Sequence, residues 1–284
     1  MKPKPPYDVA ILVLAFNRPA LLARTLASIS IALEHLGALL ETKLSVPIVV
    51  SIDGPGGGAQ GTANHEKVRR VADESRIASF IRTEHSARGL PSHLLDAYDV
   101  VLRETGARRL ICIEDDVDLS SWAIAGLLYA SDNAKESEHV ISASPRHADG
   151  SLEHQLLLIT TGAHQASVPL LRDYIQRFSL DGAEFPGGYG ARDHEAISRW
   201  MQSVGATEPT YAALGTSQDR LRERAWIQAG ISLSGLPARM VRHRGLWGQH
   251  NTPWFALRTG QLFQRVDSRS WVEIAQEIQL AYRP

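Results

Sequence analysis

Continuous apolar stretches alternate along the chain with stretches in which apolar residues recur every three or four positions. The continuous stretches are typical of strands buried on both faces of a sheet, and the periodic ones of helices that cover it. Apolar runs predict strands in the first part of the chain at residues 9–16, 46–52 and 110–113, and we expect a further short strand at 78–84. The alternation predicts an α/β fold with a mixed, mostly parallel sheet flanked by helices.

The periodic stretches predict the helices between and beyond these strands. The first begins at Pro19, with Asn17 as its N-cap, and ends near Gly37. The pattern predicts further helices at 64–77, 91–105, 122–134, 169–178, 196–201 and 271–282, and further strands at 140–144, 156–161 and 238–241. We expect all of these elements to belong to one domain.

Composition narrows the class of protein. The chain has 284 residues, 44% of them hydrophobic, and a net charge of −1, which gives no electrostatic basis for binding nucleic acid. No apolar run is long enough to span a membrane, and because the first residues lack an apolar segment we expect no signal peptide. We therefore expect a cytoplasmic protein, and leave peripheral association with a membrane open. The single cysteine, Cys112, is expected in the core.

The apolar run at 110–113 ends in three consecutive acids, Glu114, Asp115 and Asp116. Adjacent carboxylates repel one another, and a divalent cation relieves that repulsion. The carboxyl end of a central strand is also where open α/β sheets bind ligands. Oxygen ligands suit Mn²⁺ or Mg²⁺. The alternative is a solvated acidic turn.

The ends of the first two predicted strands carry further polar groups. Ala15, Phe16, Asn17 and Arg18 lead from the first strand directly into a helix N-terminus, an arrangement that favours anions such as phosphate. The second strand ends in Asp53, which can accept hydrogen bonds from a ribose or a base edge. Alternatively, these residues are a helix cap, a surface charge and an Asx-turn.

Two basic residues lie near the start of the third predicted helix. Arg88 precedes this helix and can reach a phosphate, or is simply solvated. His93 lies in its first turn, which would place the ring near the mouth of the sheet. A capping or surface role is the alternative for His93.

The second half of the chain has two more candidate segments. A loop rich in glycine and aromatic residues, 185–190, leads into Asp193 and Glu195 at a helix start, where a carboxylate can act as a general base or as a cap. Residues 242–250 hold two histidines and two arginines. In that segment His243 can complete a metal shell, and Arg244 matches a phosphate.

These motifs together resemble the GT-A fold glycosyltransferases, in particular the inverting N-acetylglucosaminyltransferase I type and family 2-like transferases. The blocks that carry the resemblance are 12–18, 47–53, His93 and 114–116, and residues 205–235 lie outside it. The resemblance implies Asp116 and His243 as metal ligands and Asp193, or Glu195, as the catalytic base. It implies contacts to the nucleotide sugar from Ala15, Phe16, Asn17, Arg18, Asp53, Arg88, His93, Glu114, Asp115 and Arg244.

By this resemblance the chain is a single Rossmann-like GT-A domain with a nucleotide-binding half (8–120), an acceptor half (121–255) and a helical extension (256–284). It would be a metal-dependent inverting hexosyl or N-acetylhexosaminyl transferase. The donor would be a UDP-sugar, and the acceptor a hydroxyl of a glycan, a lipid-linked molecule or a protein. The alternatives are a sugar-phosphate nucleotidylyltransferase, which would carry a glycine-rich basic loop after the first strand, and a non-catalytic nucleotide-sugar-binding protein.

Overall fold

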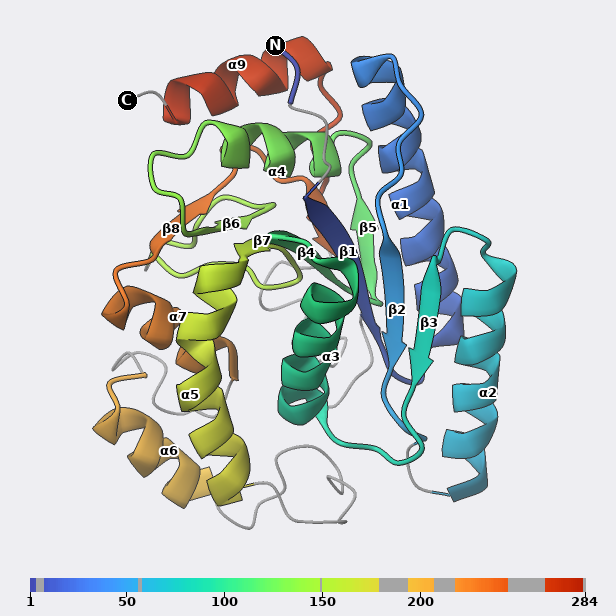
Figure 1. Cartoon of the computed structure of the whole chain (residues 1–284), viewed down its shortest axis with the longest axis vertical. Helices are drawn as coiled ribbons and strands as arrows, with labels where there is room; N and C mark the ends of the chain where they lie inside the picture. The colour runs from blue at the N-terminus through green and yellow to red at the C-terminus, as the bar shows by residue number, and fades with distance from the viewer. Residues whose placement is uncertain are drawn as a thin grey trace.

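The computed structural model describes residues 1–3, 8–55, 58–148, 150–178, 194–206, 218–244 and 264–282. A seven-stranded sheet with the order β3-β2-β1-β4-β7-β6-β8 lies at the centre, with helices on both sides (Figure 1). Its strands are β1 (Val9–Ala15), β2 (Ile48–Ile52), β3 (Phe80–Thr83), β4 (Arg109–Glu114), β6 (His139–Ser142), β7 (Leu156–Thr160) and β8 (Ser232–Gly235). A small second sheet pairs β5 (Val117–Leu119) with β9 (Val241–His243).

Strands β1 to β4 are parallel, whereas β7 runs antiparallel to both β4 and β6. The predicted α/β fold with a mixed, mostly parallel sheet is therefore confirmed. The described helices are α1 (Pro19–Leu40), α2 (Gly58–Glu74), α3 (Leu90–Thr105), α4 (Ala123–Asp132), α5 (Thr161–Phe178), α6 (His194–Ser203), α7 (Gln218–Gln228) and α9 (Trp271–Ala281). None of these helices combines the length and apolar character needed to cross a membrane.

Strand β1 shows why the central strands are continuous apolar runs. Its residues are all buried, and they alternate between two separate cores: Ile11 and Val13 pack toward α1, α2, α4 and α9, and Leu12 and Leu14 toward α3, α5, α6 and α7. Full burial of each such side chain contributes about 1.5–3 kcal/mol. The cost of losing any one position on either face fixes the register of the strand.

Several predicted boundaries are wrong for local reasons. Helix α1 continues past Gly37 and ends at Leu40, where Glu41 takes the left-handed conformation (φ 55°). The N-cap of α1 is Arg18, not Asn17, although Pro19 does occupy the first turn. Helix α5 begins at Thr161 and carries Pro169 in its interior.

Three elements were absent from the prediction: β5, β8 and α7. Strand β5 has only three residues, and β8 reads Ser-Leu-Ser-Gly, without an apolar run. Helix α7 is rich in charged residues and lacks a continuous apolar stripe. The predicted strand at 238–241 lies later, at Val241–His243, because its pairing with β5 sets its extent.

Candidate functional site

Three parallel strands bring the predicted residues to one edge of the sheet. In the ladder Leu14 pairs with Glu114 and Ala15 with Ile52, so the ends of β1, β2 and β4 lie side by side. The main-chain N–H of Asp53 donates to the Ala15 carbonyl at 2.9 Å, which continues the ladder past β2. The residues that follow each strand therefore share one region, as the strand–helix alternation predicted.

The turn after β4 is fixed by a buried hydroxyl from α1. The Oγ1 atom of Thr25 lies 3.0 Å from the Asp115 carbonyl oxygen and 2.8 Å from that of Val117, and it accepts the Val117 N–H at 3.2 Å. These contacts hold the acidic turn in a defined conformation.

A three-residue cluster lies at this turn. Strand β9 pairs with β5 so that His243 is opposite Val117, next to the acids. One ligand atom from each of Glu114, Asp116 and His243 lies within 4.8 Å of the others. Two carboxylates and an imidazole are a donor set that divalent cations accept. Among the described residues, the buried Oδ1 of Asp116 has no hydrogen-bond partner, and coordination of a cation would satisfy this oxygen instead.

Arg18 bridges two of the acids. Its guanidinium contacts both Asp115 and Asp116, and the Phe16 N–H donates to Asp115 Oδ2 at 3.1 Å. The carboxylate of Asp115 is thereby bonded to the end of β1, and it is not one of the three residues of the cluster. In this structure Asp115 connects β1 to β4, and Arg18 offsets part of the acidic charge.

The pKa values of the acids show that negative charge exceeds positive charge at this turn. Burial, reinforced by Asp116, raises the pKa of Glu114 to about 8, and burial raises that of Asp115 to about 6 despite Arg18. Burial also opposes ionisation of Asp116, but His243 and Arg18 keep the pKa of its carboxyl below the ordinary value. Burial opposes protonation of His243, yet Asp116 holds the pKa of its ring above the ordinary value. The site is short of positive charge.

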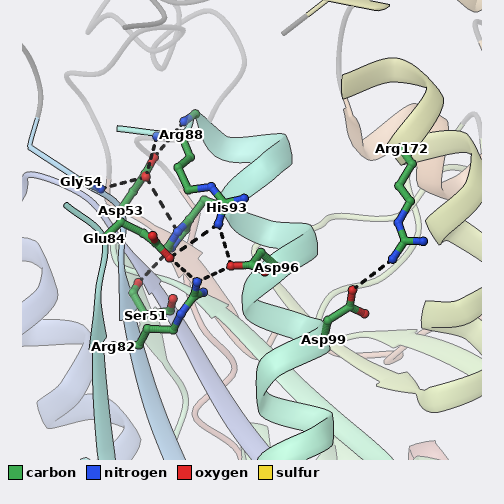
Figure 2. Close-up of polar contacts among 11 residues, drawn as sticks. Ser51, Asp53, Gly54, Arg82, Glu84, Arg88, His93, Asp96, Asp99 and Arg172 are labelled. Carbon is green, nitrogen blue, oxygen red and sulfur yellow. Dashed lines mark hydrogen bonds and ion pairs between the residues drawn. The ribbon is translucent and has the colours of Figure 1, made fainter. Parts of the chain in front are cut away.

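Asp53 organises the neighbouring segment through main-chain donors. Its carboxylate accepts the N–H groups of Gly54 (2.8 Å) and Arg88 (2.9 Å), as Figure 2 shows, and also that of Gly89 (3.1 Å). The Asx-turn that was the alternative for this residue is not formed, because it needs the N–H two residues on and Pro55 has none. A Cβ on Gly54 would lie 1.9 Å from the Ser86 carbonyl carbon, so only glycine allows the two segments to pack.

His93 lies beside Asp53 and is almost fully buried. Its Nε2 is 3.2 Å from the Ser51 carbonyl oxygen, and its Nδ1 is 3.9 Å from Asp53 Oδ1 (Figure 2). Burial lowers the pKa of this ring, so the neutral form that donates from Nε2 leaves Nδ1 as an acceptor. Nδ1 has no hydrogen-bond partner among the described residues.

The guanidinium of Arg88 forms its ion pairs with acids outside the Glu114–Asp116 turn. Its guanidinium is 2.7 Å from Asp96 and belongs to an ion-pair network with Arg82 and Glu84 (Figure 2). Arg244 is likewise paired with Asp118, while its main-chain N–H donates to the Asp116 carbonyl at 2.7 Å. The phosphate contacts predicted for Arg88 and Arg244 therefore stay predictions.

Of the two predicted catalytic carboxylates, the structure describes Glu195 and not Asp193. Asp193, the 185–190 loop and residues 245–250 lie outside the described residues. Glu195 lies in the first turn of α6, is 82% exposed, and pairs with Arg199 on the same helix at 3.0 Å. The structure therefore gives Glu195 an ordinary surface contact, and no contact with another predicted site residue is seen in the described part of the chain.

An acid that the sequence reasoning missed lies close to the cluster. Asp219 occupies the first turn of α7, 3.5 Å from His154, and its charge adds to the burial that raises the pKa of Glu114. The available signal was an acid at the start of a short helix. Because α7 has no apolar period, that helix itself was not predicted.

No family model matches the chain, and neither does any curated protein. Solved structures with a similar arrangement include S. aureus TarS, with a TM-score of 0.45 and 11% identity over 97% of this chain and 72% of that one. Another is glucosyl-3-phosphoglycerate synthase from Mycobacterium tuberculosis in complex with Mn²⁺, UDP and phosphoglyceric acid. Its TM-score is 0.42 and its identity 12%, over 97% of this chain and 78% of that one. A third is CMP:2-keto-3-deoxy-manno-octonic acid synthetase in complex with CTP. Its TM-score is 0.42 and its identity 12%, over 90% of this chain and 98% of that one.

Proposed function

We propose that this chain is a metal-dependent glycosyltransferase that transfers a sugar from a UDP-sugar to a hydroxyl acceptor with inversion. The observation that carries the proposal is the cluster of Glu114, Asp116 and His243 at the carboxyl edge of the parallel strands. This edge is where α/β sheets bind nucleotides. The resemblance of the strand-end motifs to GT-A transferases supports the same reading.

In this proposal Asp116 and His243 hold Mn²⁺ or Mg²⁺, with Glu114 beside them. When bound, the ion supplies positive charge to the diphosphate leaving group. Arg18 is the protein's own cation for the diphosphate. It is 30% exposed, and its ion pairs within the described part of the chain are with Asp115 and Asp116, so it can turn toward a phosphate oxygen once the acids are otherwise neutralised.

The uridine would bind beside Asp53 and His93. Two buried polar atoms there, Ser51 Oγ and His93 Nδ1, lack hydrogen-bond partners among the described residues. Unsatisfied buried groups are costly, and a base edge that carries both donors and acceptors would satisfy them. Asp53 contributes by fixing the 86–89 segment through the main-chain contacts already described.

We assign the general base to Asp219, with Asp193 as the competing candidate. Asp219 is 31% exposed, so it is open to an acceptor on one side, and it lies near Glu114 on the other. Asp219 lies in the first turn of α7, and a carboxylate there can remove a proton from an acceptor hydroxyl.

A thermal-shift panel tests the donor and metal together. We expect UDP with Mn²⁺ to raise the melting temperature more than GDP with Mn²⁺, and more than either nucleotide alone. At a hundred times its dissociation constant a ligand stabilises by about 2.7 kcal/mol. An equal or larger shift with GDP would remove the uridine assignment. Release of UDP from a UDP-sugar supports the transferase, and release of pyrophosphate from UTP and a sugar phosphate would point to the nucleotidylyltransferase instead.

A further inference from the structure

A row of ionisable side chains leads from Asp219 into the protein. Asp219 Oδ1 lies 3.5 Å from Nδ1 of His154, and Nε2 of His154 lies 2.9 Å from Glu223 Oε1. Asp219 is 31% exposed, whereas the side chains of His154 and Glu223 are 8% and 9% exposed. The row therefore runs from a partly exposed carboxylate to a buried one.

The hydrogen bonds of Glu223 determine where the protons are. Its Oε1 also accepts the Leu152 N–H at 2.7 Å, and its Oε2 is 3.2 Å from Arg220. Burial opposes its ionisation, but the contact with His154 keeps the pKa of Glu223 below the ordinary value. Because this carboxylate only accepts, Nε2 of His154 must donate to it. In the neutral ring Nδ1 then carries a lone pair that points toward Asp219.

The imidazole is held in this orientation by Trp226. The two rings are stacked, with centroids 5.9 Å apart and an angle of 8° between their planes. Trp226 is itself buried and donates from Nε1 to the Ala163 carbonyl at 2.8 Å. Among the described residues, Nδ1 of His154 has no hydrogen-bond partner. A buried, fixed ring that offers an unused acceptor toward a carboxylate is arranged to receive a proton from it.

We infer that His154 is a positioning residue that takes the acceptor's proton from Asp219, an inference that rests on the proposed function. The acceptor O–H bond breaks as its oxygen attacks the anomeric carbon, and the proton passes to Asp219. The bond between the sugar and the phosphate oxygen breaks, and the nucleoside diphosphate leaves with the electron pair. Asp219 then passes the proton to Nδ1 of His154. The resulting imidazolium is stabilised by Glu223, and Asp219 is ionised again.

The test compares two histidines that each contact a carboxylate. His154→Gln keeps an amide donor for Glu223 but has no ring nitrogen to accept a proton. We expect kcat for UDP release from UDP-N-acetylglucosamine, with water or a hydroxyl pool as acceptor, to fall about 10- to 100-fold. The KM for the donor should stay within about twofold. The control is His164→Gln: His164 is buried, 2.7 Å from Asp99, and outside the proposed machinery, so its kcat should not change.

Nitrogen-15 NMR of the rings gives a readout that needs no turnover. We expect His154 to be protonated at Nε2 with a lone pair at Nδ1, and we expect Glu223→Leu, which removes the acceptor of the Nε2 proton, to abolish that preference. An unchanged kcat in His154→Gln, an equal loss in His164→Gln, or a His154 ring protonated at Nδ1 instead of Nε2 would overturn the inference. If the wild type releases no UDP, the proposed function fails, and the NMR result alone decides the proton arrangement. His154→Asn replaces His154→Gln if the latter does not fold.

Discussion

Two buried carboxylates at the same edge of the sheet, Asp53 and Asp116, are held by different kinds of partner. Asp53 accepts three main-chain N–H groups, whereas Asp116 contacts the side chains of Arg18 and His243 and keeps one oxygen without a hydrogen bond among the described residues. Main-chain donors stay where the fold puts them, but side chains can turn away. Asp53 is therefore built to shape the site, and Asp116 to exchange its partners for a ligand.

The largest effect should follow from Asp116→Asn. This change removes a charged ligand from the three-residue cluster, and metal assistance is worth several kcal/mol to transfer. We expect at least about a hundredfold loss of UDP release from a UDP-sugar. The additional thermal shift that Mn²⁺ gives with UDP should also disappear.

Asp118→Asn is the matched control for that variant. Asp118 belongs to the same acidic segment but pairs with Arg244 and Arg24, and it is no part of the three-residue cluster. The additional thermal shift that Mn²⁺ gives with UDP should be the same in the Asp118→Asn protein as in the wild type. An Asp116→Asn protein that keeps the full Mn²⁺-dependent shift would place the ion elsewhere.

The second prediction separates binding from chemistry. Asp219→Asn should lower transfer by about 10²–10⁴-fold, the usual contribution of a general base, because an amide cannot accept the proton. The UDP–Mn²⁺ thermal shift should persist, since Asp219 is outside the three-residue cluster. Asp193→Asn and Glu195→Gln are measured in parallel. Loss of transfer in either of these variants, with near-normal transfer in Asp219→Asn, would return the base to the segment at 193–195.

The strand-end residues could be predicted from sequence because their signal is local. A continuous apolar run followed by Glu114 or Asp53 gives both the strand and its end, and parallel strands end at one edge. The position of His243 does not follow in this way, because the strand that carries it pairs with β5, which was absent from the prediction. The sequence could not show which carboxylate faces the cluster, because that depends on Thr25 and Arg18, which lie about a hundred positions away in the chain.

The part of the site on helix α7 has no comparable local signal in the sequence. Helix α7 carries Asp219, Arg222 and Glu223, and burial of the latter two is possible only because of distant partners. The Arg222 guanidinium donates to the Tyr98 hydroxyl at 3.0 Å and lies 4.9 Å from the Trp226 ring centroid. A charged residue with such partners looks like a surface residue in the sequence. The helix therefore contributes buried charges that no apolar period reveals.

A third, smaller effect concerns stability without any ligand. Asp53→Asn leaves one oxygen to accept but turns an amide N–H toward main-chain N–H donors, which should cost about 1–3 kcal/mol of unfolding free energy. Asp116→Asn should cost less in the absence of metal, because Arg18 keeps its contact with Asp115. Urea midpoints at constant pH measure both variants. Equal losses would show that the two carboxylates do not differ in the way their partners suggest.

The last prediction uses the raised pKa of Glu114. Burial and Asp116 raise the pKa of this carboxyl to about 8, against an ordinary value of 4.5. Below pH 4.5 the group is protonated in both the folded and the unfolded chain. As the pH rises, the unfolded chain ionises first, so the folded state loses relative stability until the pH passes about 8. Glutamine is neutral throughout and has no such loss.

Glu114→Gln should therefore stabilise the metal-free protein, by little at pH 5 and by roughly 1–3 kcal/mol at pH 8, because each unit of pKa difference is worth about 1.4 kcal/mol before neighbouring acids readjust. Thermal unfolding across that pH range measures it, with Asp118→Asn as the variant that should show no growing gain. Addition of Mn²⁺ should reverse the order at pH 8, because a bound cation favours the ionised carboxylate that only the wild type provides. A gain that is the same at every pH would mean that Glu114 is ionised in the folded protein already, and that the cluster has no deficit of positive charge for an ion to fill.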